Sequence, residues 1–184
     1  RRQTRPITLE LPDMGMDDAY AIQKAWIDLK LARGASISGY KIGLTSRAMQ
    51  QVMNIDTPDY GVLLDEMAFS DGASITASEF LDPRIEAEFG FVMKKPLYGE
   101  DVSLAVVLDA TDYVVPALEL ISARSTRTDP ETGYTRNVFD TIADNAANAE
   151  IKGVEAEFTY ASYSISGLTV AGAIGAPIRC WMCC

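Results

Sequence analysis

Residues 84–93, RIEAEFGFVM, alternate between polar and apolar side chains, and this pattern constrains the fold more than any other segment. A period of two residues is that of a β-strand, whose successive side chains point to opposite faces of a sheet. Arg84, Glu86 and Glu88 share one face, and the apolar residues between them share the other. The sequence therefore predicts a strand that carries two carboxylates on one face.

The rest of the chain alternates between helical and strand-like patterns. Apolar residues recur at helical spacing over 17–33, which predicts an amphipathic helix that ends before Gly34. Further strands are expected at 36–44, 62–69 and 111–122, and further helices at 46–53, 101–109 and 139–149, the last being either a short helix or an Asn-rich turn. Turn and loop signals occur at 58–61 and 124–138, and Pro116 requires a sheet edge or a bulge. These elements predict an α+β fold with an N-terminal helical region and a mixed, mostly antiparallel sheet.

The chain of 184 residues contains no histidine, which excludes several kinds of catalytic site. A Ser-His-Asp triad, a Cys-His dyad, a His-ligated zinc ion and a His general base are all impossible. The net charge is -10, and no basic stripe interrupts the acidic composition, so nucleic acid is not an expected partner. Anionic membranes are excluded on the same ground, and no run of eighteen apolar residues predicts a membrane span.

All three cysteines lie in the last five residues, so no disulfide is expected in the preceding part of the chain. This usage fits the reducing cytoplasm, and residues 1–10 show no signal-peptide pattern. Cys180 and Cys183 have the spacing of half a tetrahedral zinc site. We interpret that spacing as an incidental feature of the terminus.

Glu86 and Glu88 leave the same face of their strand about 7 Å apart at the backbone. Two carboxylates at that distance repel each other unless a cation or an arginine neutralises them. Oxygen ligands of this kind suit Mg²⁺ or Mn²⁺. The alternative is a solvated polar face on a half-buried strand, and the spacing alone leaves both open.

Glu119 and Lys41 each lie in an otherwise apolar strand. A carboxylate in such a segment either faces solvent at an edge or needs a partner. A lysine near a divalent metal ion is pushed toward its neutral form and can then serve as a base, although a surface lysine is the alternative.

Six motifs occur in an order that is far more specific than any one of them. They are GYKIGLTS (39–46), PDYG (58–61), PRIEAEF (83–89), ATDYV (110–114), PALELI (116–121) and FDTIADNAAN (139–148). Together, over about residues 7–149, they resemble the hydratase and decarboxylase branch of the fumarylacetoacetate hydrolase superfamily. The resemblance implies a β-roll or barrel of that superfamily's type.

The resemblance also implies a site. A divalent metal ion, normally Mg²⁺, would be held by Glu86, Glu88 and Glu119, with Lys41 and Asp59 as catalytic residues. The hydrolases of the superfamily rely on a histidine, so its absence here favours a hydratase or a decarboxylase.

The implied activity is that of a metal-dependent hydro-lyase that adds water to a small 2-oxo-alkenoate. The expected reaction converts 2-oxohept-4-ene-1,7-dioate to 4-hydroxy-2-oxoheptanedioate in the breakdown of homoprotocatechuate. Arg84 and Arg124 are candidates for binding the distal carboxylate. The alternatives are a 2-oxo-enedioate decarboxylase of the 4-oxalocrotonate type and an inactive, truncated remnant of the hydratase. Members of the family form homo-oligomers, which are expected here as well.

The resemblance stops near residue 149. The family pattern continues into a Gly-rich strand and a further region, whereas Glu150 stands here in place of the expected glycine. We therefore expect residues 1–149 to form a hydratase-like catalytic domain that is incomplete at its C-terminus. Residues 150–184 are expected to be an unrelated tail.

Overall fold

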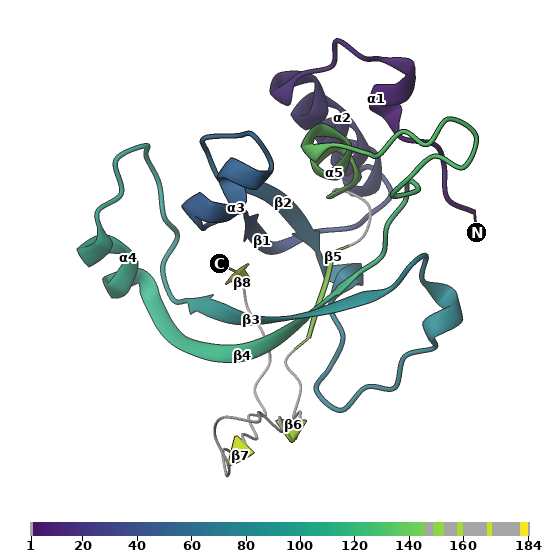
Figure 1. The fold of residues 1–184 in the computed structure, drawn as a ribbon. Helices are drawn as coiled ribbons and strands as arrows, with labels where there is room; N and C mark the ends of the chain where they lie inside the picture. The colour runs from purple at the N-terminus through teal and green to yellow at the C-terminus, as the bar shows by residue number, and fades with distance from the viewer. Residues whose placement is uncertain (1, 146–148, 153–157, 160–168, 171–180, 184) are drawn as a thin grey trace.

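The computed structural model describes residues 2–145, 149–152, 158–159, 169–170 and 181–183. Its centre is a six-stranded, mostly antiparallel sheet, in which the β1–β8 pair alone is parallel (Figure 1). In spatial order, its strands are β2 (Asp59–Leu64), β1 (Ile37–Gly43), β8 (Trp181–Cys183), β3 (Arg84–Met93), β4 (Thr111–Ile121) and β5 (Ala149–Lys152). A two-stranded sheet pairs β6 (Phe158–Thr159) with β7 (Thr169–Val170). The expectation of helices and a mixed, mostly antiparallel sheet is confirmed.

The helices gather mainly at the β2 end of the sheet, as Figure 1 shows for α1, α2 and α5. They are α1 (Ile7–Glu10), α2 (Met16–Leu31), α3 (Arg47–Val52), α4 (Leu104–Ala110) and α5 (Val138–Asn145), with short 3₁₀ turns η1 (Asp65–Met67) and η2 (Ala77–Glu79). Every predicted helix is present, and residues 139–145 form a helix rather than a turn, whereas Ala149 already belongs to β5. In the described part of the chain, no helix combines the length and the apolar character that crossing a membrane requires.

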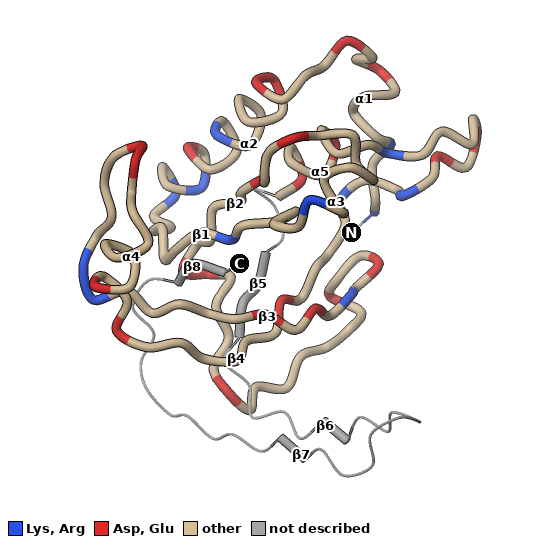
Figure 2. The backbone as a smooth tube through the Cα atoms, turned by 60° about the vertical axis from the view of Figure 1, so that its left-hand side comes forward, with Lys and Arg blue, Asp and Glu red and all other residues tan. Residues whose placement is uncertain are grey.

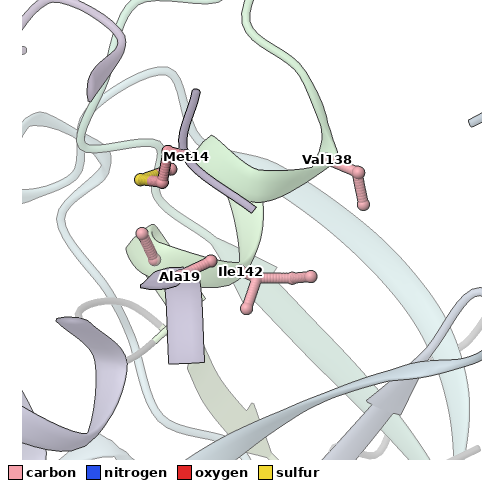
Figure 3. Packing of buried hydrophobic residues seen from close by; sticks show 5 residues of the cluster. Met14, Ala19, Val138 and Ile142 are labelled. Carbon is pink, nitrogen blue, oxygen red and sulfur yellow. The ribbon is translucent and has the colours of Figure 1, made fainter. Parts of the chain in front are cut away.

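The α2–α5 interface forms one hydrophobic core. Figure 3 shows Met14, Ala19, Val138 and Ile142 together, and Ala19 and Ile142 are completely buried. Asp18 accepts a hydrogen bond from the backbone N–H of Gly15, which fixes the start of α2. This core holds α5 against the sheet beside β2.

Strands β3 and β4 form a long, curved hairpin joined through α4 (Figure 1). The predicted strand at 84–93 is confirmed in full. Pro116 lies opposite Phe89, and β5 pairs with β4 only from Leu118 onward, so Pro116 lies outside that second ladder. Ile85 and Phe89 of β3 are on the outer face, where they are 67% and 66% exposed, whereas Val92 is buried against Val115.

Two predictions about residues 58–69 are wrong in part. Asp59 and Gly61 belong to strand β2 rather than to a turn, because they pair with β1. The strand ends at Leu64 rather than at residue 69, since the Asp65 carboxylate accepts hydrogen bonds from the backbone N–H and hydroxyl of Ser36 and the chain then turns into η1. The Pro-Asp-Tyr-Gly sequence resembles a turn, but pairing with β1 outweighs this local preference.

The N-terminal segment is tied to the loop between β4 and α5. Arg5 forms a two-point ion pair with Asp129, whose side chain is fully buried, with distances of 2.6 Å and 3.1 Å. Asp129 also accepts hydrogen bonds from the backbone N–H and hydroxyl of Thr132. The bond from Arg5 holds the pKa of Asp129 below its usual range.

Replacing Asp129 with asparagine is expected to lower the melting temperature by several degrees at pH 7, because the ion pair is lost while an acceptor for Thr132 remains. The folded pKa of Asp129 lies below the unfolded value, so its contribution is present above the unfolded pKa of about 3.9 and is lost as the pH falls below it. Thermal unfolding of both proteins from pH 7 to pH 2 should therefore show converging melting temperatures. Glu131→Gln, at the exposed second partner of Arg5, is the control and should change little.

Candidate metal centre

Three glutamates meet where β3 pairs with β4. Glu86 lies directly opposite Glu119 in the antiparallel ladder, and Glu88 follows two residues later on the same face. One carboxylate oxygen from each residue lies within 4.8 Å of those of the other two. Glu119 is buried, Glu88 is half-buried and Glu86 is exposed. The structure thus brings together the three acids expected to hold a metal ion, and carboxylate oxygens are the ligands that Mg²⁺ prefers.

Lys41 extends from β1 to this cluster. Its Nζ donates a hydrogen bond to Oε1 of Glu119 over 2.7 Å, and its side chain is only 16% exposed. Figure 2 shows a basic segment on β1 and acidic segments along β3. Glu119 therefore has the partner that its apolar flanks required, and Lys41 is not a surface lysine.

Asp59 lies behind Lys41 at the start of β2 and is 5% exposed. Burial raises the pKa of Asp59, while the charge of Lys41 and a 3.4 Å hydrogen bond from Nδ2 of Asn145 act against that rise. A buried carboxyl group with a raised pKa is suited to hold a proton close to Lys41.

Each of the two motifs that carry Lys41 and Asp59 contains a glycine that leaves room for the charged side chain of the other motif. In the β1–β2 ladder Gly43 lies opposite Asp59, and Gly61 lies opposite Lys41. A Cβ at Gly43 would come within 2.2 Å of Oδ1 of Asp59, and one at Gly61 would lie 3.0 Å from Cε of Lys41. Each functional side chain thus occupies the space above a glycine on the neighbouring strand.

Gly43→Ala is expected to destabilise the fold by about 1–3 kcal/mol, because the added methyl group overlaps a buried carboxylate. Gly61→Ala meets the flexible end of a lysine instead, so it should cost less stability while moving Lys41 away from Glu119. Chemical denaturation of the two variants measures the difference. Equal stability of Gly43→Ala and the wild type would contradict the close packing.

The charges of the cluster favour a divalent cation. Burial raises the pKa of Glu88, and the neighbouring charges of Glu119 and Glu86 raise it further. When ionised, three carboxylates and one ammonium group leave two negative charges, which a divalent cation neutralises. The arrangement can therefore bind a metal ion beside a lysine and a buried acid.

Comparison with known proteins identifies relatives of this chain. The chain is 54% identical over 151 residues to 2-oxo-hept-4-ene-1,7-dioate hydratase of Escherichia coli, covering 82% of this chain and 57% of the relative. It is 41% identical over 143 residues to 2-keto-4-pentenoate hydratase of Paraburkholderia xenovorans, covering 78% of this chain and 51% of the relative. No protein-family model matches the sequence.

A solved structure agrees with these sequence relatives. The fold matches 4-oxalocrotonate decarboxylase from Pseudomonas putida G7, complexed with magnesium and adipate, with a TM-score of 0.73 and 35% identity. The match covers 82% of this chain and 55% of that structure. The chain belongs to the hydratase and decarboxylase branch of the fumarylacetoacetate hydrolase superfamily. It spans about half the length of the curated relatives that it matches.

The two arginines that were expected to bind substrate, Arg84 and Arg124, have other contacts in the structure. Arg84 begins β3, with a half-exposed side chain 3.8 Å from Asp82. The guanidinium of Arg124 lies over the ring of Trp26, 5.7 Å from its centroid. Neither side chain is among those that line the small cavity beside Lys41 and Glu119.

The sequence analysis did not single out three residues that line this cavity, namely Arg136, Asp144 and Asn145. Asp144 and Asn145 lie in the motif FDTIADNAAN, which was recognised only as part of the family resemblance. Arg136 stands just before that motif in a loop with no periodic pattern. Nothing in the sequence alone separates it from the other arginines of the chain.

Proposed function

We propose that residues 1–149 carry the metal-binding and catalytic residues of a hydro-lyase that adds water to a 2-oxo-alkenoate. The observation that carries this proposal is the convergence of three carboxylates with Lys41 on one of them. The names of the sequence relatives support hydration as the reaction. Residues 150–184 would contribute no catalytic residue, although their strands β5 and β8 pair within the central sheet.

The metal ligands in this proposal are Glu86, Glu88 and Glu119, and the ion is Mg²⁺, with Mn²⁺ as a substitute. The oxygen donors and the two uncompensated negative charges fit such an ion. When bound, the metal ion would act as a Lewis acid on the carboxylate and keto oxygens of the 2-oxo acid.

Lys41 and Asp59 would handle the protons. The Nζ of Lys41 points to the cluster and would move a proton at the carbon chain of the substrate during ketonisation of the dienol. Asp59 would hold a proton behind Lys41, because burial raises its pKa. In the 2-oxo-4-ene acid a proton would leave C3 to give the dienol, and ketonisation would add a proton at C5, which brings the double bond to C3–C4 in conjugation with the keto group. Water would then add with its hydroxyl at C4 and a proton at C3, which gives the 4-hydroxy-2-oxo acid.

The proposed substrate is 2-oxohept-4-ene-1,7-dioate, and the product is 4-hydroxy-2-oxoheptanedioate. This choice follows the relative with 54% identity. It places the reaction in the breakdown of aromatic compounds such as homoprotocatechuate, in the cytoplasm.

Calorimetric titration with Mg²⁺ in the presence of oxalate, which mimics the enolised head of a 2-oxo acid, is the first test. We expect saturable binding that oxalate strengthens, followed by a hydration assay in which the product is identified. Absence of binding in a folded sample would reject the proposal for this chain and favour an inactive remnant.

Decarboxylation of a 2-oxo-enedioate is the second candidate, because two solved structures that match this fold are of a 4-oxalocrotonate decarboxylase. Both reactions use a 2-oxo acid head at the same metal ligands, so the metal titration does not separate them. Product analysis does, since decarboxylation alone releases CO₂.

We also propose that the sheet contributes to a β-roll or barrel within a homo-oligomer. The outer face of the β3–β4 hairpin supports burial against further protein, because Ile85, Phe89 and Val114 are exposed there. Light scattering of the purified chain tests the oligomeric state, and a monomer at micromolar concentration would contradict it.

A further inference from the structure

A small cavity of about 30 Å³ lies beside the Lys41–Glu119 ion pair. Its lining adds the apolar side chains of Ile121 and Ala123 and the oppositely charged side chains of Arg136 and Asp144. Such a volume holds about two water-sized groups, which is the size of a carboxylate and far less than a seven-carbon acid. The cavity can therefore receive one end of a substrate whose other end lies at the glutamates.

Arg136 presents a cation to this cavity with few of its donors in use. Its side chain is 15% exposed, and in the described part of the chain its Nη1 donates one hydrogen bond of 3.3 Å, to the backbone oxygen of Ser125. Oδ2 of Asp144 lies 3.8 Å from Nη1, so the two side chains form an ion pair without a hydrogen bond, and no donor of Arg136 is used by it. Asp144 instead accepts from the backbone N–H and the hydroxyl of Ser125, at 3.1 Å and 2.7 Å. A guanidinium has five N–H donors, so most of them remain for a ligand.

We infer that Arg136 binds the distal carboxylate of a dicarboxylic 2-oxo acid and so makes the site prefer dioates over monocarboxylic 2-oxo acids. The planar guanidinium matches a carboxylate with two parallel hydrogen bonds. The 2-oxo acid head would occupy the side of Lys41 and Glu119 that faces the other two glutamates. This inference rests on the proposed function, because it takes the three glutamates as the site of the 2-oxo acid head.

Arg136 is better placed for this role than the two arginines that the sequence suggested. Arg84 is half-exposed beside Asp82, so solvent competes for its donors. Arg124 is stacked over Trp26. Only Arg136, of these three, lines a cavity together with Lys41 and Glu119.

The test compares two saturated ligands that differ only in the distal carboxylate, 2-oxoheptanedioate and 2-oxoheptanoate. Their binding to the full chain with Mg²⁺ is measured by calorimetry. The wild type should bind the dioate about 10- to 100-fold more tightly, as a charge-assisted bidentate contact allows. Arg136→Met should bind both ligands equally, with unchanged affinity for oxalate. Arg127→Met, an exposed arginine of the same loop, should keep the wild-type preference.

The outcomes separate this inference from the proposed function. A preference for the dioate that survives in Arg136→Met, or equal binding of both ligands by the wild type, overturns the role of Arg136 and leaves hydration intact. Failure of the wild type to bind either ligand in the presence of Mg²⁺ overturns both. Arg136→Lys keeps the positive charge but lacks the planar guanidinium, so it should retain only part of the preference for the dioate. This variant keeps the inference testable if Arg136→Met does not fold.

Discussion

Replacing Glu88 with glutamine is expected to weaken Mg²⁺ binding by about 100-fold or more. The loss of a supporting hydrogen bond around a metal site already costs about 10–100-fold in affinity, and here a charged ligand itself is lost. The carboxylate of Glu88 is repelled by both other acids of the cluster, because burial and the charges of Glu119 and Glu86 all raise its pKa. A bound cation relieves that repulsion. Glutamine is neutral, so Glu88→Gln reduces the repulsion and with it the electrostatic gain from binding the cation.

Calorimetry with Mg²⁺ alone, at fixed pH, measures the effect of Glu88→Gln without any dependence on turnover. Glu100→Gln makes the same change of charge at an exposed position and should bind Mg²⁺ as the wild type does. An affinity of Glu88→Gln equal to that of the control would remove Glu88 from the metal ligands.

Lys41→Ala is expected to reduce turnover by about 10²- to 10⁴-fold, which is the usual contribution of a positioned proton-transfer group. The affinity for the metal ion should be kept, because Lys41 is not one of its ligands. The Nζ of Lys41 donates to Oε1 of Glu119 and so competes with the metal ion for that carboxylate. Without metal the variant should also lose several kcal/mol of stability, since Glu119 stays buried without its partner. Added Mg²⁺ should restore much of that loss by binding to the folded state.

Product formation and thermal unfolding, with and without Mg²⁺, measure these effects for Lys41→Ala. Lys24→Ala is the matched control, because Lys24 is largely exposed and, among the residues that the structure describes, forms its ion pair with Asp28 on its own helix. Normal turnover of Lys41→Ala would refute the catalytic role. Weakened metal binding would instead place Lys41 among the groups that organise the glutamates.

Local sequence patterns were sufficient to predict most of the helices and strands. The alternation in 84–93 determined β3 to the residue. Ser46 and Ser103 each accept a hydrogen bond from a backbone N–H in the first turn of α3 and α4, so both predicted helices begin at a local cap. The error at residues 58–61 has a different origin. Pro, Asp and Gly are turn residues by local preference, whereas the membership of Asp59 in β2 depends on its partner strand β1.

The residues of the candidate site likewise fall into those that the sequence indicated and one that only the tertiary structure revealed. Residue type and spacing were enough to select the two acids of β3, since a period of two puts them on one face of any strand. Lys41 and Glu119 stood out as charged residues in apolar strands, and the family motifs assigned them roles and added Asp59. The structure then brought these residues together. Arg136 was not found, because no period or motif relates it to the acids and only the folding of its loop brings it to the cavity.

The amino-acid sequence by itself determined the chemistry open to this protein: no histidine, a pair of carboxylates on one strand face, and a lysine and a third acid in apolar strands. Only the tertiary structure decided which of these groups meet. The β3–β4 register sets Glu86 opposite Glu119, and the β1–β2 register sets each of Lys41 and Asp59 against a glycine. The physical reason is that side-chain type and period act over a few residues, whereas register and burial depend on contacts between segments as far apart as Lys41 and Glu119.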